Sequence, residues 1–130
     1  MSLILSLALQ LGTPSTRPAD TFAARVTRGK LVEAGPTGPG YQKILWRQLD
    51  GPVTTALKTC IASHAPADKS PFTVVAEIRP DGAPRRVEAQ PATPLAGCFA
   101  RWLRTQTLPA PPRLTDTTDY PIEIDVSIVH

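Results

Sequence analysis

The clearest pattern along the chain is strict alternation in the ten residues from Tyr120 to Val129. Between Tyr120 and Val129 every second residue is apolar (Ile122, Ile124, Val126 and Ile128), and the residues between them are polar (Glu123, Asp125 and Ser127). A period of two is that of a strand with one face on a core and one face in water. The pattern therefore predicts a terminal strand whose apolar face packs on helices.

A second alternating segment predicts a β-hairpin in the middle of the chain. Phe72, Val74, Ala76 and Ile78 alternate with Thr73, Val75, Glu77 and Arg79. The sequence Pro80-Asp81-Gly82 then supplies a tight reversal, because glycine accepts a positive φ. The return strand runs over about 84–90, with Val87 and Ala89 facing inward.

Two stretches carry apolar residues at the spacing of a helix. The first covers about 53–64, with Asp50-Gly51-Pro52 as its start and Pro66 beyond its end, and 41–49 is either a preceding helix or its extension. The second covers about 94–107, with Thr93 as N-cap and Pro94 in the first turn. Their apolar stripes consist of Val53, Leu57, Cys60, Ile61 and His64, and of Leu95, Cys98, Phe99, Trp102 and Leu103. The predicted fold is α+β, with two helices packed on one face of a three-stranded antiparallel sheet (α-β-β-α-β).

The first forty residues are expected to precede the compact domain rather than to form part of its core. Leu3 to Leu11 is an apolar run of signal-peptide length, which predicts a cleaved leader over 1–19; an ordinary buried segment is the alternative. Residues 20–40 then form a linker with a possible short hairpin turning near Arg28-Gly29, closed by the glycine- and proline-rich break 35–40. The compact domain is expected over 41–130.

Composition narrows the class of protein. With 130 residues and 42% hydrophobic content, the chain has room for one domain, and its 15 prolines favour short elements. The net charge of +3 comes from scattered basic residues, and aromatics make up 5%. A nucleic-acid surface needs clustered basic residues and stacking aromatics, so nucleic acid is not expected as a partner.

Cys60 and Cys98 are the two cysteines of the chain, and each lies on the apolar stripe of a different predicted helix. This placement favours one disulfide between the helices and hence an oxidising compartment. Two sharper alternatives remain open: a thiolate–imidazole pair of Cys60 with His64, and a zinc site adding Cys98 and His130. The apolar surroundings favour the structural role, so we expect no metal or other cofactor.

Acidic residues gather near the C-terminus, where Asp116, Asp119, Glu123 and Asp125 lie within ten positions. A hydrolase pair is conceivable, but Glu123 and Asp125 share the polar face of the predicted strand, where solvation explains them. We therefore expect neither a catalytic residue nor a small-molecule substrate.

From Leu57 onward the chain resembles the C-terminal domain of TonB-type proteins, in particular the disulfide-bearing form in myxobacterial gliding-motility and adventurous-motility proteins. The resemblance rests on the order of short motifs. These are a helix with Cys60 (ALKTCIASHA), the Pro80-Asp81-Gly82 turn, a return strand with Val87, a helix with Cys98 and Trp102 (PLAGCFARWL), and the exit Leu108-Pro109-Ala110. Leucine replaces the usual phenylalanine at the exit, and Gln90 to Thr93 replaces the usual serine-serine-glycine.

The resemblance implies a non-enzymatic module that accepts a partner strand at a sheet edge. We expect a periplasmic protein of a Gram-negative bacterium, exported and not membrane-spanning, with a protein partner in the cell envelope. The edge of the terminal strand, marked by Ile122, Ile124, Val126 and Ile128, is the expected contact. The alternative is a small secreted inhibitor or immunity protein acting through a loop, at 35–40 or 108–118.

Overall fold

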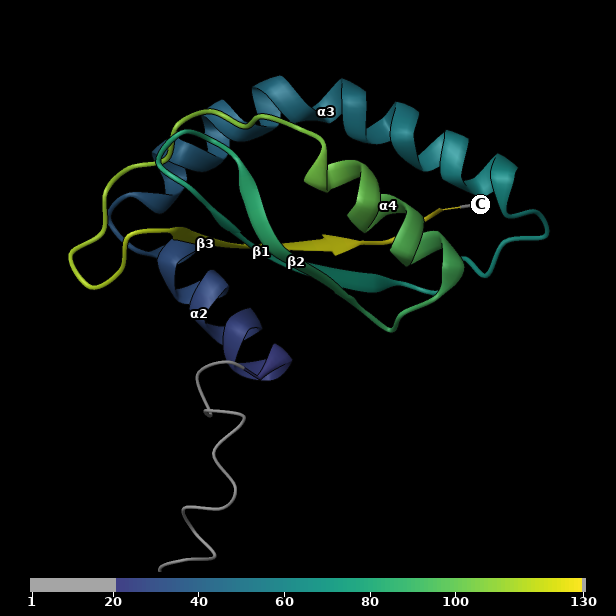
Figure 1. Ribbon diagram of the computed structural model, residues 1–130, viewed down its shortest axis with the longest axis horizontal. Coiled ribbons are helices and arrows are strands. Elements are labelled where there is room, and N and C mark those ends of the chain that lie inside the picture. The colour runs from purple at the N-terminus through teal and green to yellow at the C-terminus, as the bar shows by residue number, and fades with distance from the viewer. Residues whose placement is uncertain (1–20, 130) are drawn as a thin grey trace, which may run out of the picture.

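The computed structural model describes residues 21–129, which form three α-helices and one three-stranded sheet (Figure 1). In chain order the elements are α2 (Phe22–Ala34), α3 (Gly38–Ser63), β1 (Phe72–Ile78), β2 (Pro84–Gln90), α4 (Pro94–Arg104) and β3 (Tyr120–Val126). The predicted α+β class, with two helices on an antiparallel sheet, is confirmed, and α2 is an additional helix. The predicted leader over 1–19 lies outside the described residues.

The sheet is antiparallel throughout and has the strand order β2-β1-β3. The predicted hairpin of β1 and β2 is present, and Gly82 takes the positive φ of 92° that its turn requires. Strand β3 returns along the other side of β1, pairing from Phe72–Val126 to Ile78–Tyr120. It ends at Val126, three residues before the end of the alternating pattern.

Helices α3 and α4 cover the face of the sheet that carries Phe72, Val74, Ala76 and Ile78, and the main hydrophobic core lies between them and the sheet. Helix α4 begins as expected, with the Thr93 hydroxyl accepting a hydrogen bond from the backbone of Ala96. Its Phe99 is fully buried and lies 5.9 Å from Phe72, centroid to centroid. The apolar stripe of α4 therefore packs on the sheet, as its helical spacing predicts.

The predicted start of the first helix at residues 50–52 is wrong. Helix α3 runs for 26 residues from Gly38 and contains Pro52 in its interior, so 41–49 is an extension of the same helix. One buried stripe, formed by Tyr41, Leu45, Leu49, Ala56 and Cys60, continues across the proline. The packing energy of this stripe outweighs the one backbone hydrogen bond that proline removes.

Cys60 of α3 and Cys98 of α4 form a disulfide, with their Cα atoms 5.8 Å apart. Because both sulfur atoms are bonded to each other, Cys60 is not the free thiol that a nucleophile or a zinc ligand would need. The prediction of a bridge between the two helices is confirmed.

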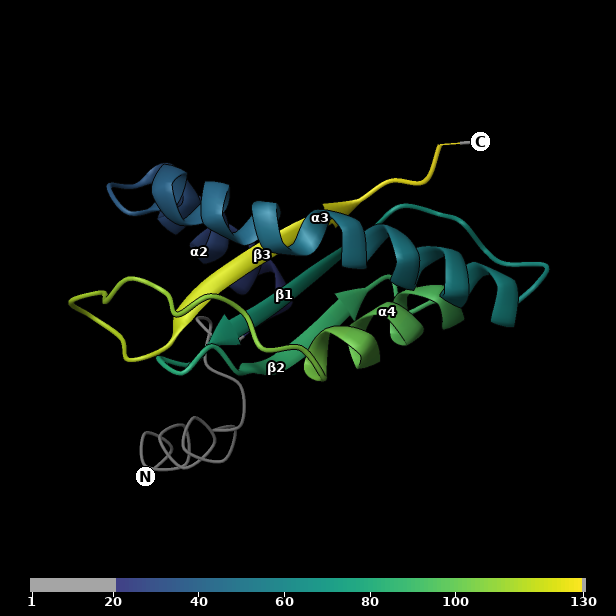
Figure 2. The same cartoon turned by 90° about the horizontal axis from the view of Figure 1, so that it is seen from above.

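The predicted hairpin and linker over 20–40 are wrong, because most of this segment is α2. The helix lies against the second face of the sheet, opposite α3 and α4, so the domain has three layers (Figures 1 and 2). Helical periodicity did not show because the residues that face the sheet are Arg25, Gly29 and Val32 rather than a run of apolar side chains. Thr21 caps the helix by accepting a hydrogen bond from Ala24.

Removing the disulfide should weaken the fold substantially. The two cysteines are 38 positions apart, and a bridge closing a loop of that length stabilises by about 4 kcal/mol in the chain-entropy model. The double variant Cys60→Ala with Cys98→Ala should lose free energy of unfolding of that order, measured by urea denaturation. An unchanged urea midpoint would contradict it.

Gly29 is predicted to be required for the close approach of α2 to β3. A Cβ at this position would lie 2.7 Å from the Cβ of Glu123, and 3.2 Å from its backbone nitrogen. Gly29→Ala should therefore destabilise by about 1–3 kcal/mol, although alanine is the better helix former. Gly40→Ala in α3, where nothing lies within 4 Å, is the matched control and should be neutral or slightly stabilising in thermal unfolding. Equal midpoints for the two variants would refute the packing argument.

Candidate functional site

The expected contact, the edge of β3, is an outer strand of the sheet, and no further strand of residues 21–129 pairs with it. The side chains of Ile122, Ile124 and Val126 lie in the core and are at most 7% exposed, while Ile128 is half-buried against it. These side chains therefore stabilise β3 rather than face a partner. What the edge offers to a partner is its backbone.

Two prolines show which backbone groups of β3 point outward. Pro121 lies opposite Glu77 in the β1–β3 ladder, and Pro84 lies opposite Ile78 in the β1–β2 ladder. Proline has no N–H, so neither pair can be one of the hydrogen-bonded pairs of its ladder. Glu77 therefore directs its backbone groups away from β3 and Ile78 directs its own away from β2, as the alternation of neighbouring residues along β1 requires. The backbone N–H and C=O groups of successive residues in a strand point to opposite sides. Glu123 and Asp125 lie two and four positions beyond Pro121, so their N–H and C=O groups also point away from β1.

Part of this edge is covered by the connection between α2 and α3. These helices lie on opposite faces, so residues 35–37 pass around the edge of β3, and Thr37 Oγ1 lies 3.1 Å from Tyr120 Oη. Gly29 packs directly on the backbone of Glu123. The accessible part is therefore 125–129, which we call the open edge, where exposure still alternates and Val129 is 91% exposed.

The other edge of the sheet, β2, is blunted. Opposite Ala76 the β1–β2 register shifts by one residue, a β-bulge at which Arg86 has a φ of 51°. Arg25 Nη2 donates to the Arg86 carbonyl at 2.6 Å, and Arg104 Nη2 donates to the Val87 carbonyl at 2.7 Å. Two carbonyls that could accept from another strand are thus occupied by arginine side chains.

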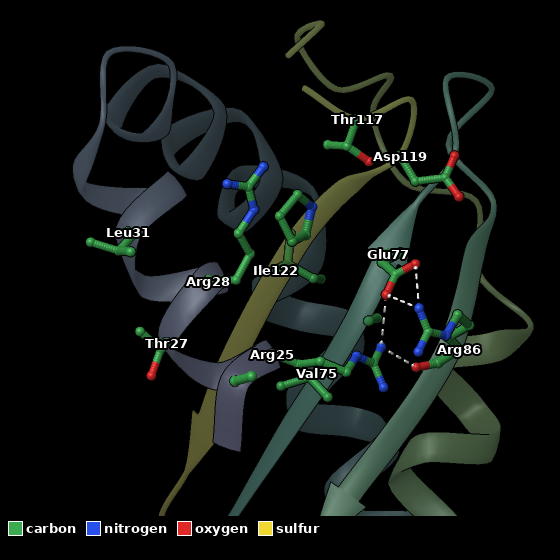
Figure 3. A pocket seen from close by; sticks show the side chains of 13 residues that line it. Arg25, Thr27, Arg28, Leu31, Val75, Glu77, Arg86, Thr117, Asp119 and Ile122 are labelled. Atoms are coloured by element: carbon green, nitrogen blue, oxygen red, sulfur yellow. Dashed lines mark hydrogen bonds and ion pairs between the residues drawn. The ribbon is translucent and has the colours of Figure 1, made fainter. Parts of the chain in front are cut away.

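Arg25 is also the centre of an ion-pair network between α2 and the sheet. It is 8% exposed, and its Nη1 lies 3.2 Å from Glu88 Oε1. Its Nη2 lies 3.3 Å from Glu77 Oε2, and Arg86 Nη1 lies 2.9 Å from the same oxygen (Figure 3). Each charge in this network has a counter-charge, as a buried guanidinium requires.

A groove of about 440 Å³ opens beside this network, between α2, the sheet and the loop before β3 (Figure 3). Leu31, 66% exposed, and Arg28 line its α2 side, and Thr117 and Asp119 line the loop side. The cationic groups in its wall are already paired, Arg28 with Asp116 at 2.8 Å. The residues that line the groove do not indicate which class of ligand it would bind.

The expectation that Glu123 faces water is wrong, because α2 covers it. Its side chain is 4% exposed, and Lys30 Nζ lies 3.2 Å from its Oε2 without hydrogen-bond geometry. Burial, followed by its hydrogen bond with Asp125, raises the pKa of Glu123 to about 7, while Lys30 opposes the shift. Hydrogen bonds from Glu123 and from Thr73 lower the pKa of Asp125.

The remaining acidic candidates do not come together as a catalytic pair. Asp116 is bound to Arg28 at the rim of the groove, whereas Glu123 and Asp125 share Lys30 beneath α2. Across residues 21–129, no three histidine, cysteine or acidic residues are grouped so that they could hold a metal ion. His130, the fourth ligand of the alternative zinc site, lies outside that range.

Three residues that order this region, Arg25, Gly29 and Lys30, were not expected from sequence. One signal points to them: Val74-Val75-Ala76 is a run of three apolar residues, which indicates a strand covered on both faces.

In the described part of the chain, none of the helices combines the length and apolar composition needed to cross a membrane.

The buried carboxyl should give stability a characteristic pH dependence. The pKa of Glu123 is about 7 in the fold against an ordinary 4.5, so its contribution to stability is full below about pH 4.5 and is lost as the pH rises to 7. Glu123→Gln should therefore gain on the order of 2 kcal/mol relative to the wild type between pH 5 and pH 8, measured by urea unfolding. Asp125→Asn is the control in the acid range: the pKa of Asp125 is lowered from 3.8, so its contribution is lost only as the pH falls below about 4, and this variant should differ in pH dependence from the wild type there. Parallel pH profiles of the wild type and Glu123→Gln would refute the assignment.

The site is thus an open strand edge on a stapled three-layer domain, with a second edge that is blunted by arginine side chains. No family model, no curated protein and no solved structure matches this chain. What the open edge does is therefore argued from this chain's own residues.

Proposed function

We propose that this domain is a non-enzymatic protein-binding module of the TonB C-terminal-like type, which pairs a partner strand with the open edge, 125–129. The observation that carries the proposal is the difference between the two edges of the sheet. Two carbonyls of β2 accept hydrogen bonds from Arg25 and Arg104, whereas Asp125, whose N–H and C=O point outward, is followed by a segment in which Ser127 and Val129 are exposed. Main-chain hydrogen bonds at such an edge give β-augmentation its affinity.

The order of elements supports the same proposal. From α3 onward the chain runs helix, strand, strand, helix, strand, with a disulfide joining the two helices, and this is the order on which the resemblance rests. The disulfide favours an oxidising compartment, and we propose the periplasm of a Gram-negative bacterium, with a protein partner in the cell envelope.

The edge is tested by a proline at Ser127. By alternation from Asp125 its N–H points outward, so Ser127→Pro removes a donor to the partner without breaking a bond to β1. Peptides selected from a displayed random dodecapeptide library against the oxidised domain serve as probes. Ser127→Pro should weaken their binding at least tenfold with an unchanged thermal midpoint, whereas Ser127→Ala, which keeps the N–H, should bind as the wild type does.

Two outcomes would overturn the proposal. One is retained binding by Ser127→Pro; the other is failure of the library to yield any peptide that binds the domain. If variants in loop 108–118 abolish binding instead, the inhibitor-like alternative replaces edge pairing.

A further inference from the structure

A groove of about 490 Å³ opens between α3 and α4, which run side by side (Figure 2). Thr55 and Thr59 line its α3 side, Trp102 lines its α4 side, and both Cys60 and Cys98 form part of its wall. The two threonines are exposed and Trp102 is half-buried, so the groove is open to water. One side of the disulfide therefore faces this groove rather than the core.

The two cysteines differ in how far they are covered. Cys60 is 3% exposed and belongs to the buried stripe of α3, whereas Cys98 is half-buried and packs against the core from its side. Exchange begins when a thiolate attacks one sulfur of a disulfide, and access helps to decide which sulfur is attacked. A thiolate that enters the groove therefore reaches Cys98 more easily than Cys60.

Small residues beside the bridge leave this approach open. Ala56 of α3 lines the groove next to the two threonines, and Gly97 precedes Cys98 in α4. A Cβ at Gly97 would have only the end of the Arg101 side chain within 4 Å, at 3.5 Å. The surface of α4 immediately before Cys98 is thus uncovered apart from one guanidinium.

From this geometry we infer that the Cys60–Cys98 bridge is a thiol–disulfide exchange site of the folded domain, attacked at Cys98 by a thiolate from outside the chain. The new bond joins the incoming sulfur to Cys98 Sγ; the bond between the two cysteines breaks, and its electron pair leaves on Cys60 Sγ, which takes up a proton. A second thiol of the donor then attacks the mixed disulfide and releases Cys98 as a thiol. The donor is oxidised from a dithiol to a disulfide, and the domain gains two electrons.

The core is expected to hold the reduced domain together. Phe99 and Leu103 of α4 are fully buried and α4 packs on β2, so the helix keeps its contacts with the sheet when its bond to α3 is broken. Reduction would remove the stabilisation that the bridge provides without removing the core. The stability of the domain would then follow the thiol–disulfide balance of its surroundings, independently of the proposed edge pairing.

The lining of the groove indicates which kind of thiol donor fits it. Among residues 21–129, no charged side chain lines the groove. The charged groups of glutathione would therefore lose water there without gaining a counter-charge, which is costly. A dithiol carried on the apolar surface of another protein, as in a Cys-x-x-Cys motif, meets no such penalty. We expect a protein dithiol to be the donor.

The dependence of reduction on urea separates attack on the folded domain from attack on an unfolded chain. The oxidised chain is incubated with dithiothreitol and quenched with an alkylating agent, and its free thiols are counted by intact mass. Attack in the groove should give a rate that changes by less than about twofold between water and about 1 M urea. A bridge reached only through global unfolding would be reduced about fivefold or more faster in the urea, because the unfolded population rises by at least that factor. That result would overturn the inference.

The attacked sulfur can be identified in the wild-type chain. After brief exposure to reduced glutathione and acid quenching, peptide mapping should find glutathione on Cys98 at about tenfold or greater excess over Cys60. The reverse distribution would show that the buried sulfur is the one attacked and would overturn the assignment.

A matched pair of variants tests the groove itself. Thr59→Phe places a larger side chain in the groove and should slow reduction by dithiothreitol about fivefold. Thr54→Phe changes an exposed threonine of the same helix that does not line the groove, and it should be reduced at the wild-type rate. Equal rates for the two variants would show that thiols do not enter through the groove.

The source of the thiol is tested by comparing reduced thioredoxin with reduced glutathione. Each rate is divided by the rate of the same donor with a small, unhindered disulfide, so that intrinsic reactivity cancels. The ratio should be higher for thioredoxin, because the groove offers no counter-charge to glutathione. A higher ratio for glutathione would overturn the assignment of a protein donor.

Discussion

Strand β1 is buried on both of its faces, and this requirement determines where every helix lies. Val74 and Val75 point in opposite directions, and each is 1% exposed. The face of Val74 is covered by the long α3 and by α4, which the disulfide ties together. The face of Val75 is left to α2, which has to cross both β1 and β3 to cover it. The path of α2 in turn leaves 125–129 as the open end of β3.

Helix α2 is attached to the sheet by charges more than by apolar area. Its buried residues are Arg25 and Gly29, and its contacts run through Glu77, Glu88 and Glu123. Breaking one partner of such a pair is costly, but the pairs themselves add little net stability over apolar packing. We expect α2 to be the element that opens most easily, and it lies across the covered half of the edge.

Periodicity predicts the elements whose buried face is apolar and misses the one whose buried face is not. The hairpin, α4 and β3 follow from alternation or helical spacing, and the Cys60–Cys98 bridge follows from their stripes. Helix α2 buries an arginine and a glycine, so its sequence carries no apolar stripe to detect. Because α2 was not predicted from the sequence, Glu123 beneath it was expected to face water. The open edge could be placed in β3 from sequence, but its restriction to 125–129 depends on how α2 and α3 pass around the strand.

The difference between the two edges of the sheet also limits the size of the assemblies that this domain can form. A sheet with two open edges adds a neighbour on each side and can grow without limit into a fibre. Here the bulge at Arg86 and the guanidinium of Arg104 obstruct one edge, so within residues 21–129 the proposed strand-binding edge is 125–129 alone. With strand pairing at 125–129 alone, as proposed, association ends at a pair, either with a foreign strand or with a second copy. Such a domain can reach a high local concentration without polymerising through its strand edges.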